Sequence, residues 1–306
     1  MFNAIAMNQE DIERIEHTLF FEQPNMRQRM IRFTALILFA SIIATCGLLS
    51  DSVASIIGAM IIAPLMTPLM GIVVAIVIGS GDRAIRCLVI AVIGIVLAIA
   101  TGWLIAWLMP YGWDPLASAQ VLSRTEPKLL DLVVALASGG AGAYALSRPD
   151  VADALPGVAI AISLVPPLNT VGILLAGGEY HLAKGAMLLF VTNFTAILLA
   201  GAVTFVITGL AAGAKHDGPE LRTSLIGILL LALLVSVPLM ANSNHLWTDT
   251  RREQRARGVV SSWLDETGWE LVEVDVDGSS VNLVLAGSGD VPDTSDVVPK
   301  LRDIMG

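Results

Sequence analysis

Two long apolar stretches of the chain contain prolines close to small polar residues. A proline lacks the backbone N–H and clashes with the preceding helical turn, so the carbonyl groups that it frees inside a bilayer need another partner. Hydroxyl groups, an amide and unwound carbonyl groups at that depth can replace the hydration shell of an ion or bind a small polar solute. We therefore predict a binding site for an ion or solute, formed by Pro64, Thr67 and Pro68 in the first stretch and by Ser163, Pro166, Pro167, Asn169 and Thr170 in the second. In the alternative interpretation, the hydroxyl groups only satisfy the carbonyls that the prolines leave free.

Three further polar residues accompany these stretches. Asn193 lies in the apolar segment that follows the second stretch, where it could face the same pathway. Asp51 and Asp150 stand at the start of the two stretches, and a carboxylate in such a position is typical of a helix N-cap. We expect both to be helix caps; the alternative is that they attract cations towards the pathway.

The sequence contains none of the common catalytic signatures. It has no HExxH, GxSxG or Walker motif, and its four histidines lie at segment ends or in loops without metal-ligand spacing. The two cysteines, Cys46 and Cys87, lie within apolar segments, where packing as small hydrophobic residues is expected. We predict that the chain is not an enzyme and that it has no catalytic residue, metal site or cofactor.

The two proline stretches align with each other without a gap at an offset of 99 residues. Between Asp51–Ala84 and Asp150–Ala183, 8 of 34 positions are identical, whereas a composition this biased gives about three or four by chance. The identical pairs are Asp51/Asp150, Gly58/Gly157, Ile61/Ile160, Leu65/Leu164, Pro68/Pro167, Leu69/Leu168, Gly79/Gly178 and Ala84/Ala183. The apolar segments on either side superpose as well. A duplicated membrane unit with an interrupted helix in each copy is typical of transport proteins.

The composition is that of an integral membrane protein. Of the 306 residues, 55% are hydrophobic and only 15% are charged, and the mean hydropathy is +0.74. In soluble domains about a quarter of the residues are charged. We predict an all-α membrane protein with about seven hydrophobic segments, in which two three-helix repeats contain the proline-broken helices, and with a small C-terminal soluble α+β domain. The predicted parts are an amphipathic N-terminal helix at 1–24, membrane repeats at 30–110 and 129–210, an additional transmembrane helix at 221–240 and the soluble domain at 250–306.

The relative orientation of the repeats depends on how the broken stretches pass through the membrane. Three full crossings in each repeat would invert the second copy, whereas re-entrant hairpins would make the copies parallel; we favour the inverted arrangement. Arginines around the first and third spans favour a cytoplasmic N-terminus, but four arginines between positions 251 and 257 favour a cytoplasmic C-terminus. Seven crossings cannot satisfy both, and we favour the N-terminus inside.

The predicted soluble domain contains a β-hairpin signal. Segments 269–276 and 279–286 alternate between apolar and polar residues and are joined by Asp277 and Gly278. We expect this domain to be regulatory or to form oligomers. The net charge of −9, of which the 12 acidic and 6 basic residues of 241–306 contribute −6, gives no support for nucleic-acid binding.

The segments around the prolines resemble one known family. GAMIIAPLMTPLMG (58–71) and GVAIAISLVPPLNTVG (157–172) are similar to segments of the membrane proteins grouped as domain-of-unknown-function family 389, also called the uncharacterised hydrophobic domain. The resemblance covers approximately residues 30–210. It implies a multi-pass protein of a prokaryotic cell (inner) membrane, but no substrate.

The repeat, the prolines and the polar groups together predict a function. We predict a membrane transporter or channel for an ion or small polar solute, with its site at the two proline-broken helices near the bilayer midplane. The alternative is a non-transporting membrane scaffold or sensor whose soluble tail recruits a partner. The expected partners are the lipid bilayer, the unidentified ion or solute, and further copies of the chain in a homo-oligomer.

Overall fold

The structure is a computed structural model that describes most of the chain. The described residues are 7, 9–22, 24–110, 113–148, 150–151, 164–210, 255–264, 269–277, 280–287, 294 and 297–305. The chain divides into two compact units, Met1–Pro238 and Leu239–Gly306.

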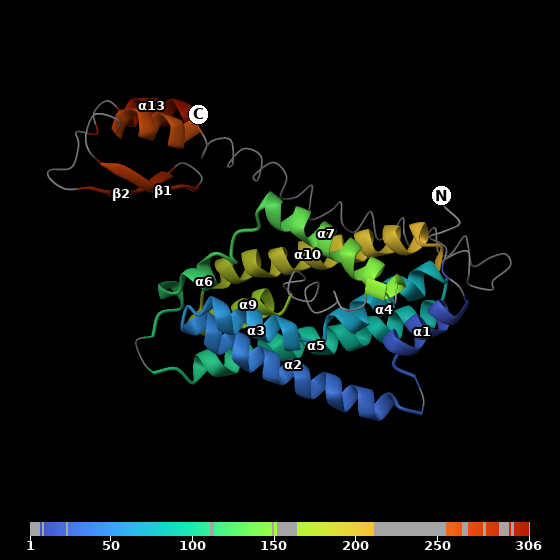
Figure 1. The fold of residues 1–306 in the computed structure, drawn as a ribbon. Coiled ribbons are helices and arrows are strands. Elements are labelled where there is room, and N and C mark those ends of the chain that lie inside the picture. The colour runs from blue at the N-terminus through green and yellow to red at the C-terminus, as the bar shows by residue number, and fades with distance from the viewer. Residues whose placement is uncertain are drawn as a thin grey trace. The chain divides into compact units, whose positions relative to one another are not determined.

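The described part of the first unit consists mostly of helices (Figure 1). Four of them are long and apolar enough to cross a membrane: α2 (Met26–Leu49), α5 (Gly81–Trp107), α7 (Leu129–Ser147) and α10 (Tyr180–Ile207). A bent pair of shorter helices, α3 (Val53–Ile62) and α4 (Met66–Val77), forms a fifth candidate span. The described residues of this unit also form α1 (Gln9–Leu19), η2 (Pro115–Ala117), α6 (Ala119–Leu122) and α9 (Val165–Gly177). The predicted helical, membrane-embedded class is confirmed, and the segment predicted at 221–240 lies outside the described residues.

Prolines explain where α3 and α4 separate. Ala63 precedes Pro64 and ends α3 with extended backbone (φ −64°, ψ 122°), as expected for a residue before a proline. Pro68 lies in the first turn of α4, where a missing N–H costs no helical hydrogen bond. The pair is consequently bent by 47° at this break. Pro166 and Pro167 lie in the first turn of α9 in the same way.

The amphipathic helix α1 lies against one end of the helix bundle, which we call the α1 end. Arg29, near the start of α2, donates to the carbonyl oxygen of Phe20 at 2.7 Å. Arg83, at the start of α5, forms ion pairs with Glu16 at 3.0 Å and with Glu22 at 2.8 Å. The starts of α2 and α5 therefore lie at the α1 end, and so does the end of α4, because only three residues separate α4 from α5.

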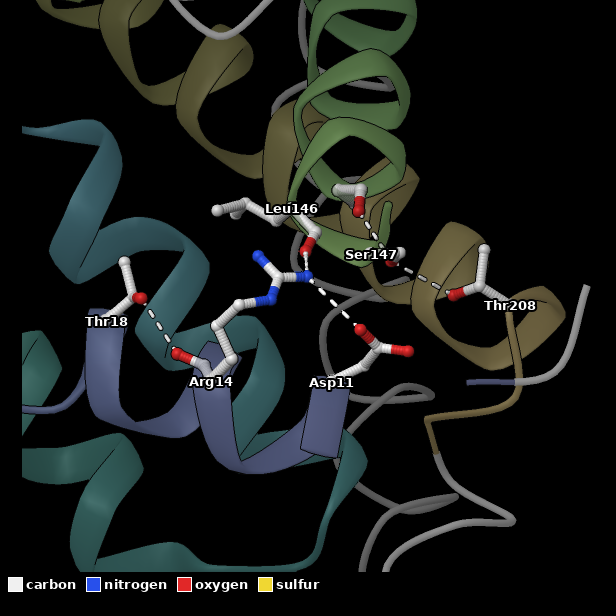
Figure 2. Close-up of polar contacts among 7 residues, drawn as sticks. Asp11, Arg14, Thr18, Leu146, Ser147 and Thr208 are labelled. Atoms are coloured by element: carbon white, nitrogen blue, oxygen red, sulfur yellow. Dashed lines mark hydrogen bonds and ion pairs between the residues drawn. The ribbon is translucent and has the colours of Figure 1, made fainter. Parts of the chain in front are cut away.

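The ends of α7 and α10 lie at the α1 end as well (Figure 2). Arg14 of α1 donates to the carbonyl oxygen of Leu146 at 3.1 Å and approaches the carboxylate of Asp11 to 3.7 Å. Ser147 is the last residue of α7, and Thr208 is the C-cap of α10. Their hydroxyl oxygens lie 3.2 Å apart. One short helix thus contacts elements from both halves of the unit.

The other end of the bundle, which we call the α6 end, collects the opposite helix ends. Ser118, just before α6, donates to the carbonyl oxygen of Leu48 at the end of α2 at 2.6 Å. Gly177 ends α9 so close to η2 that an added Cβ atom would lie 2.7 Å from Pro115. The end of α5 and the starts of α3, α7 and α10 lie at the α6 end as well, because each is close along the chain to one of these contacting elements. Because α5 spans both ends with 27 residues, they lie roughly 40 Å apart.

The start of α3 differs from the prediction. Ser52 is the N-cap of α3, because its hydroxyl accepts from the backbone N–H of Ser55 at 3.4 Å. Asp51 has a left-handed backbone (φ 54°) that ends α2, and its carboxylate accepts from Gln120 N–H at 2.8 Å and lies 3.1 Å from the hydroxyl oxygen of Ser118. Asp51 therefore caps α6 rather than the helix that follows it, and that prediction is corrected. A residue that terminates the preceding helix lies one position too early to reach the free N–H groups of α3.

The described part of the second unit contains a β-hairpin and two helical segments. Strands β1 (Glu270–Asp277) and β2 (Ser280–Ala286) pair antiparallel, with Asp277 opposite Ser280. Residues 255–264 form one helix and α13 (Val297–Met305) another. Their apolar residues share a small core, which consists of Ala256, Val260, Leu264, Val274, Val297 and Leu301. The predicted small C-terminal sheet is thereby confirmed.

Candidate functional site

Asn169, predicted as a site residue, lies at the contact between α9 and α2. Its side chain is completely buried, and its Nδ2 atom donates to the carbonyl oxygen of Ser41 at 2.5 Å and to Oγ1 of Thr45 at 2.7 Å. Thr170, the next residue of α9, is completely buried as well. We call Ser41, Thr45, Asn169 and Thr170 the α2–α9 polar cluster.

Three oxygen atoms of the α2–α9 polar cluster have no hydrogen-bond partner among the described residues. They are Ser41 Oγ, Asn169 Oδ1 and Thr170 Oγ1. Leaving a buried polar group unpaired costs about 1–3 kcal/mol. Each of these atoms could instead accept a hydrogen bond from a water molecule or a polar solute, which is the chemistry that the sequence predicts for this stretch.

The backbone next to the α2–α9 polar cluster is tightly packed. A Cβ atom added to Gly102 of α5 would lie 2.6 Å from the carbonyl oxygen of Asn169. Gly172, one turn further along α9, lies directly against the backbone of Ile99 and Trp103. Glycine at both positions lets α5 and α9 approach each other closely, so on this side the cluster borders a dry helix contact.

A cavity of about 250 Å³ lies at the first turn of α9 and has both polar and apolar walls. It is lined by Ser123, Arg124, Asp131, Val134, Ala135, Pro167, Leu189, Asn193 and Ile197. Two of these, Pro167 and Asn193, are residues predicted for the site. The Oδ1 atom of Asn193 is buried and has no partner among the described residues. The cavity therefore brings a proline of the second stretch together with the predicted amide of the next segment.

Arg124 supplies a positive charge to the cavity wall. Its Nη1 atom donates to the backbone carbonyl and side-chain oxygens of Gln120 and to the hydroxyl of Ser123. Burial lowers the pKa of its guanidinium group, and the carboxylates of Asp131 and Asp51 oppose that shift. The group remains charged, because arginine is not deprotonated in proteins at ordinary pH. Its place in the connection between α6 and α7 keeps it at the α6 end of the bundle.

Asp131 supplies a negative charge to the same wall from the first turn of α7. Its Oδ2 atom accepts from the backbone N–H of Lys128 at 2.8 Å, a contact that satisfies one of the free donors before the helix. The structure thus places two opposite charges on one cavity that also contains Pro167.

The predicted residues of the first proline stretch lie apart from this cavity wall. Pro64 and Thr67 are half-buried, and Pro68 is buried. The hydrogen bonds of the Asn169 side chain go to α2 rather than to Thr67. Leucines that flank the two breaks share one apolar cluster, namely Leu65, Leu69, Leu164 and Leu168. Asp150 is exposed, while the helix that it is predicted to cap and Ser163 lie outside the described residues.

Sequence analysis missed four polar residues of these sites. Ser41 and Thr45 could have been found from the sequence, because polar residues four positions apart within an apolar span share one helix face. Arg124 and Asp131 gave no such signal, because neither the connection before α7 nor the first turn of α7 has a sequence pattern that ties it to α9 or α10. Within the described part of the chain, no group of three or more His, Cys, Asp or Glu residues is placed to hold a metal ion.

Comparison with known proteins finds a match to one family. Residues 60–199 match the sequence profile of the family described as domain of unknown function (DUF389). This stretch of the chain is similar to a DUF389 domain. This confirms the resemblance predicted from the two proline segments, and the family description gives DUF389 proteins no function.

One archaeal relative has a similar sequence. An uncharacterized protein of Methanocaldococcus jannaschii is 28% identical to the chain over 196 residues, which are 64% of this chain and 60% of that protein. The chain therefore spans about three fifths of the length of that relative. No solved structure matches the chain.

Proposed function

We propose that this DUF389 protein is a membrane transporter or channel for an ion or small polar solute, with a pathway that passes the first turn of α9. The observation that carries the proposal is the cavity of about 250 Å³ that reaches Pro167 and Asn193. Asn193 is near the middle of α10, so it would lie near the bilayer midplane. The cavity thus extends from residues of the α6 end to this depth, where a polar wall is costly in a bilayer unless water or a polar solute contacts it.

The helix bounds support an internal repeat as part of the proposal. A shift of 99 residues moves α4 from 66–77 to 165–176, and α9 occupies 165–177. The same shift moves α5 from 81–107 to 180–206, and α10 occupies 180–207. Gly79 and Gly178, which this shift superposes, both have left-handed backbone with φ of 77° and 82°. These coincidences support the repeat that we propose at an offset of 99 residues.

The directions of the helices support inversion of the second copy. α2 and α5 run from the α1 end to the α6 end, whereas their equivalents α7 and α10 run from the α6 end to the α1 end. α4 ends at the α1 end, and its equivalent α9 ends at the α6 end beside Pro115. Inverted repeats that meet at discontinuous helices are the architecture expected of secondary transporters.

The distribution of basic residues supports an orientation in the membrane. Seven arginines lie on α1 or on helix ends at the α1 end: Arg14, Arg27, Arg29, Arg32, Arg83, Arg86 and Arg148. Arg124, Lys128 and Lys184 lie at the α6 end. We place the α1 end on the cytoplasmic side of a prokaryotic inner membrane, because cytoplasmic segments carry the excess of Lys and Arg.

Thiol labelling tests the pathway directly. In a chain with Cys46→Ala and Cys87→Ala, Asn193→Cys should react with a charged, membrane-impermeant methanethiosulfonate reagent in membrane vesicles. Val96→Cys is the matched control, because Val96 lies near the middle of α5 with 58% of its surface exposed and would face lipid. An Asn193→Cys thiol that reacts no faster than the Val96→Cys thiol would contradict the proposed pathway.

Flux into liposomes separates the two predicted functions. A transporter or channel should move a labelled solute or ion only when the protein is present. The non-transporting scaffold or sensor predicts no flux together with an unreactive thiol at position 193. We also propose a homo-oligomer, and cross-linking in membranes that yields monomer alone would contradict that part.

A further inference from the structure

The cavity at the first turn of α9 carries two opposite charges that do not pair with each other. Arg124 and Asp131 both line it, yet the ion pairs among the described residues do not include one between them. The Nε and Nη2 atoms of Arg124 make no hydrogen bond to a described residue. One oxygen of Asp131 accepts from Lys128 N–H, and the other has no hydrogen bond to a described residue. Both side chains therefore have polar atoms that could form hydrogen bonds to a solute.

The rest of the cavity wall is mainly apolar. Apart from Ser123 and the Asn193 amide, it consists of Val134, Ala135, Pro167, Leu189 and Ile197. A volume of about 250 Å³ is at or below the lower end of the range for small-molecule sites. The site therefore suits a small solute with an apolar body and a few polar groups.

The opposite charges of Arg124 and Asp131 disfavour a solute that carries only one charged group. An anion would pair with Arg124 and leave the Asp131 carboxylate uncompensated, and a cation would pair with Asp131 and leave Arg124 with only its weaker electrostatic interaction with Asp51. An uncompensated charge in a partly desolvated site is costly. A solute with one group of each sign satisfies both side chains at once.

We infer that the cavity binds a small zwitterion of the α-amino acid type with an aliphatic side chain. The Arg124 guanidinium binds the solute carboxylate, for which its planar set of N–H donors is well suited. The Asp131 carboxylate binds the solute ammonium group, the Asn193 amide lies within the same wall, and the apolar residues contact the aliphatic side chain. This inference names the solute class of the proposed function and rests on that function for transport, but not for binding.

Three probes of similar shape test the inference on the unmodified protein. L-Valine carries both charges, isovalerate lacks the ammonium group, and isobutylamine lacks the carboxylate. Isothermal titration of the full chain in lipid nanodiscs should give saturable binding of L-valine and affinities at least about tenfold weaker for the two analogues. Absence of saturable valine binding, or equal affinity for valine and isovalerate, would overturn the inference.

Variants test the two charged residues. Arg124→Gln and Asp131→Asn should each weaken valine binding by about tenfold or more. Asn at position 131 can still accept from Lys128 N–H, so the helix start is preserved while the charge is lost. Lys184→Gln is the matched control, because Lys184 is an exposed cation near the start of α10 that does not line the cavity, and it should bind valine like the unmodified chain. Binding that Arg124→Gln and Asp131→Asn leave unchanged in folded protein would place valine elsewhere and overturn the assignment.

The outcomes separate this inference from the proposed function. Valine binding without any flux into liposomes would uphold the zwitterion site and contradict transport. Flux of another solute or ion without valine binding would uphold transport and overturn the zwitterion site.

Discussion

The side-chain amide of Asn169 donates a 2.7 Å hydrogen bond to the hydroxyl oxygen of Thr45, which lies 124 residues earlier in the chain. The Thr45 hydroxyl hydrogen is itself donated to the carbonyl oxygen of Ser41 at 2.7 Å, so its oxygen is free to accept. The same carbonyl accepts a second hydrogen bond from Asn169. The two bonds from Asn169 tie α9 to α2 inside the bundle, and they occupy the donor atom of Asn169 without any solute.

The contact between Asn169 and Thr45 predicts a measurable coupling. Thr45→Val should lower the free energy of unfolding by about 1 kcal/mol, and Asn169→Ala by about 2–3 kcal/mol, since the larger truncation also leaves a cavity. The double variant should lose about 1 kcal/mol less than the sum. Unfolding in mixed micelles, monitored by circular dichroism, gives the free energy of unfolding for the unmodified chain, the two single variants and the double variant.

Thr195 provides the control for this cycle. It is also buried, but its hydroxyl donates only within its own helix, to the carbonyl oxygens of Val191 and Thr192. Thr195→Val should therefore show no coupling to Asn169→Ala. A coupling energy for Thr45 as small as that for Thr195 would contradict a stabilising bond between α2 and α9.

The close contact of α5 with α9 predicts that Gly102 does not tolerate a side chain. In Gly102→Ala the new methyl group would lie 2.6 Å from the carbonyl oxygen of Asn169, so the helices must move apart. Overpacking of this kind costs about 1–3 kcal/mol. Gly58→Ala is the control, because Gly58 lies within α3 with open space around its missing Cβ, and alanine there should stabilise by up to about 1 kcal/mol. Similar unfolding free energies for the two variants would argue against backbone contact between α5 and α9.

Hydropathy and proline placement predicted the spans, because both act through the local chain. The length of α5 and the break after Ala63 follow from apolar composition and from the restriction on a residue before proline. The β1–β2 hairpin follows from alternation around a two-residue turn. Each of these features depends on residues within a few turns of one another.

The site depended on contacts that no local pattern reveals. Arg124 belongs to a connection that looks like a linker, and only the packing of α7 against α10 brings it to Pro167 and Asn193. Asp51 has the residue type and position of an N-cap, but its left-handed backbone directs its carboxylate to Gln120, 69 residues away. In both cases tertiary structure fixed the partner of the side chain, which residue type alone does not reveal.

Asp51 has a left-handed backbone and also accepts a hydrogen bond from Gln120, and substitutions can remove these two features separately. Asp51→Asn should change the free energy of unfolding by less than about 1 kcal/mol, because asparagine tolerates left-handed backbone and can still accept from Gln120. Asp51→Gly keeps the backbone conformation but loses the acceptor, and should cost about 1 kcal/mol. Asp51→Ala loses both and should cost about 2–3 kcal/mol. If alanine proved no worse than glycine, the left-handed conformation at this position would be refuted.

The attachment of α1 to the bundle predicts a selective effect of Arg29. Its guanidinium donates to the carbonyl oxygens of His17, Thr18 and Phe20 at 2.5, 3.3 and 2.7 Å, so it satisfies the acceptors that the end of α1 leaves free. Arg29→Ala should detach α1 while the spans remain folded, and limited proteolysis should then cut within residues 9–22 at least about tenfold faster.

Arg27 is the matched control for this prediction. It is two positions earlier in α2, is exposed, and makes no hydrogen bond to a described residue, so Arg27→Ala removes the same charge without removing a cap of α1. Proteolysis of Arg27→Ala should match that of the unmodified chain. Equal acceleration in both variants would mean that net charge near the membrane, rather than the bonds from Arg29, holds α1 in place. Arg29→Lys should restore slow cleavage only in part, because lysine keeps the charge and can reach one carbonyl oxygen but lacks the planar set of donors that binds three.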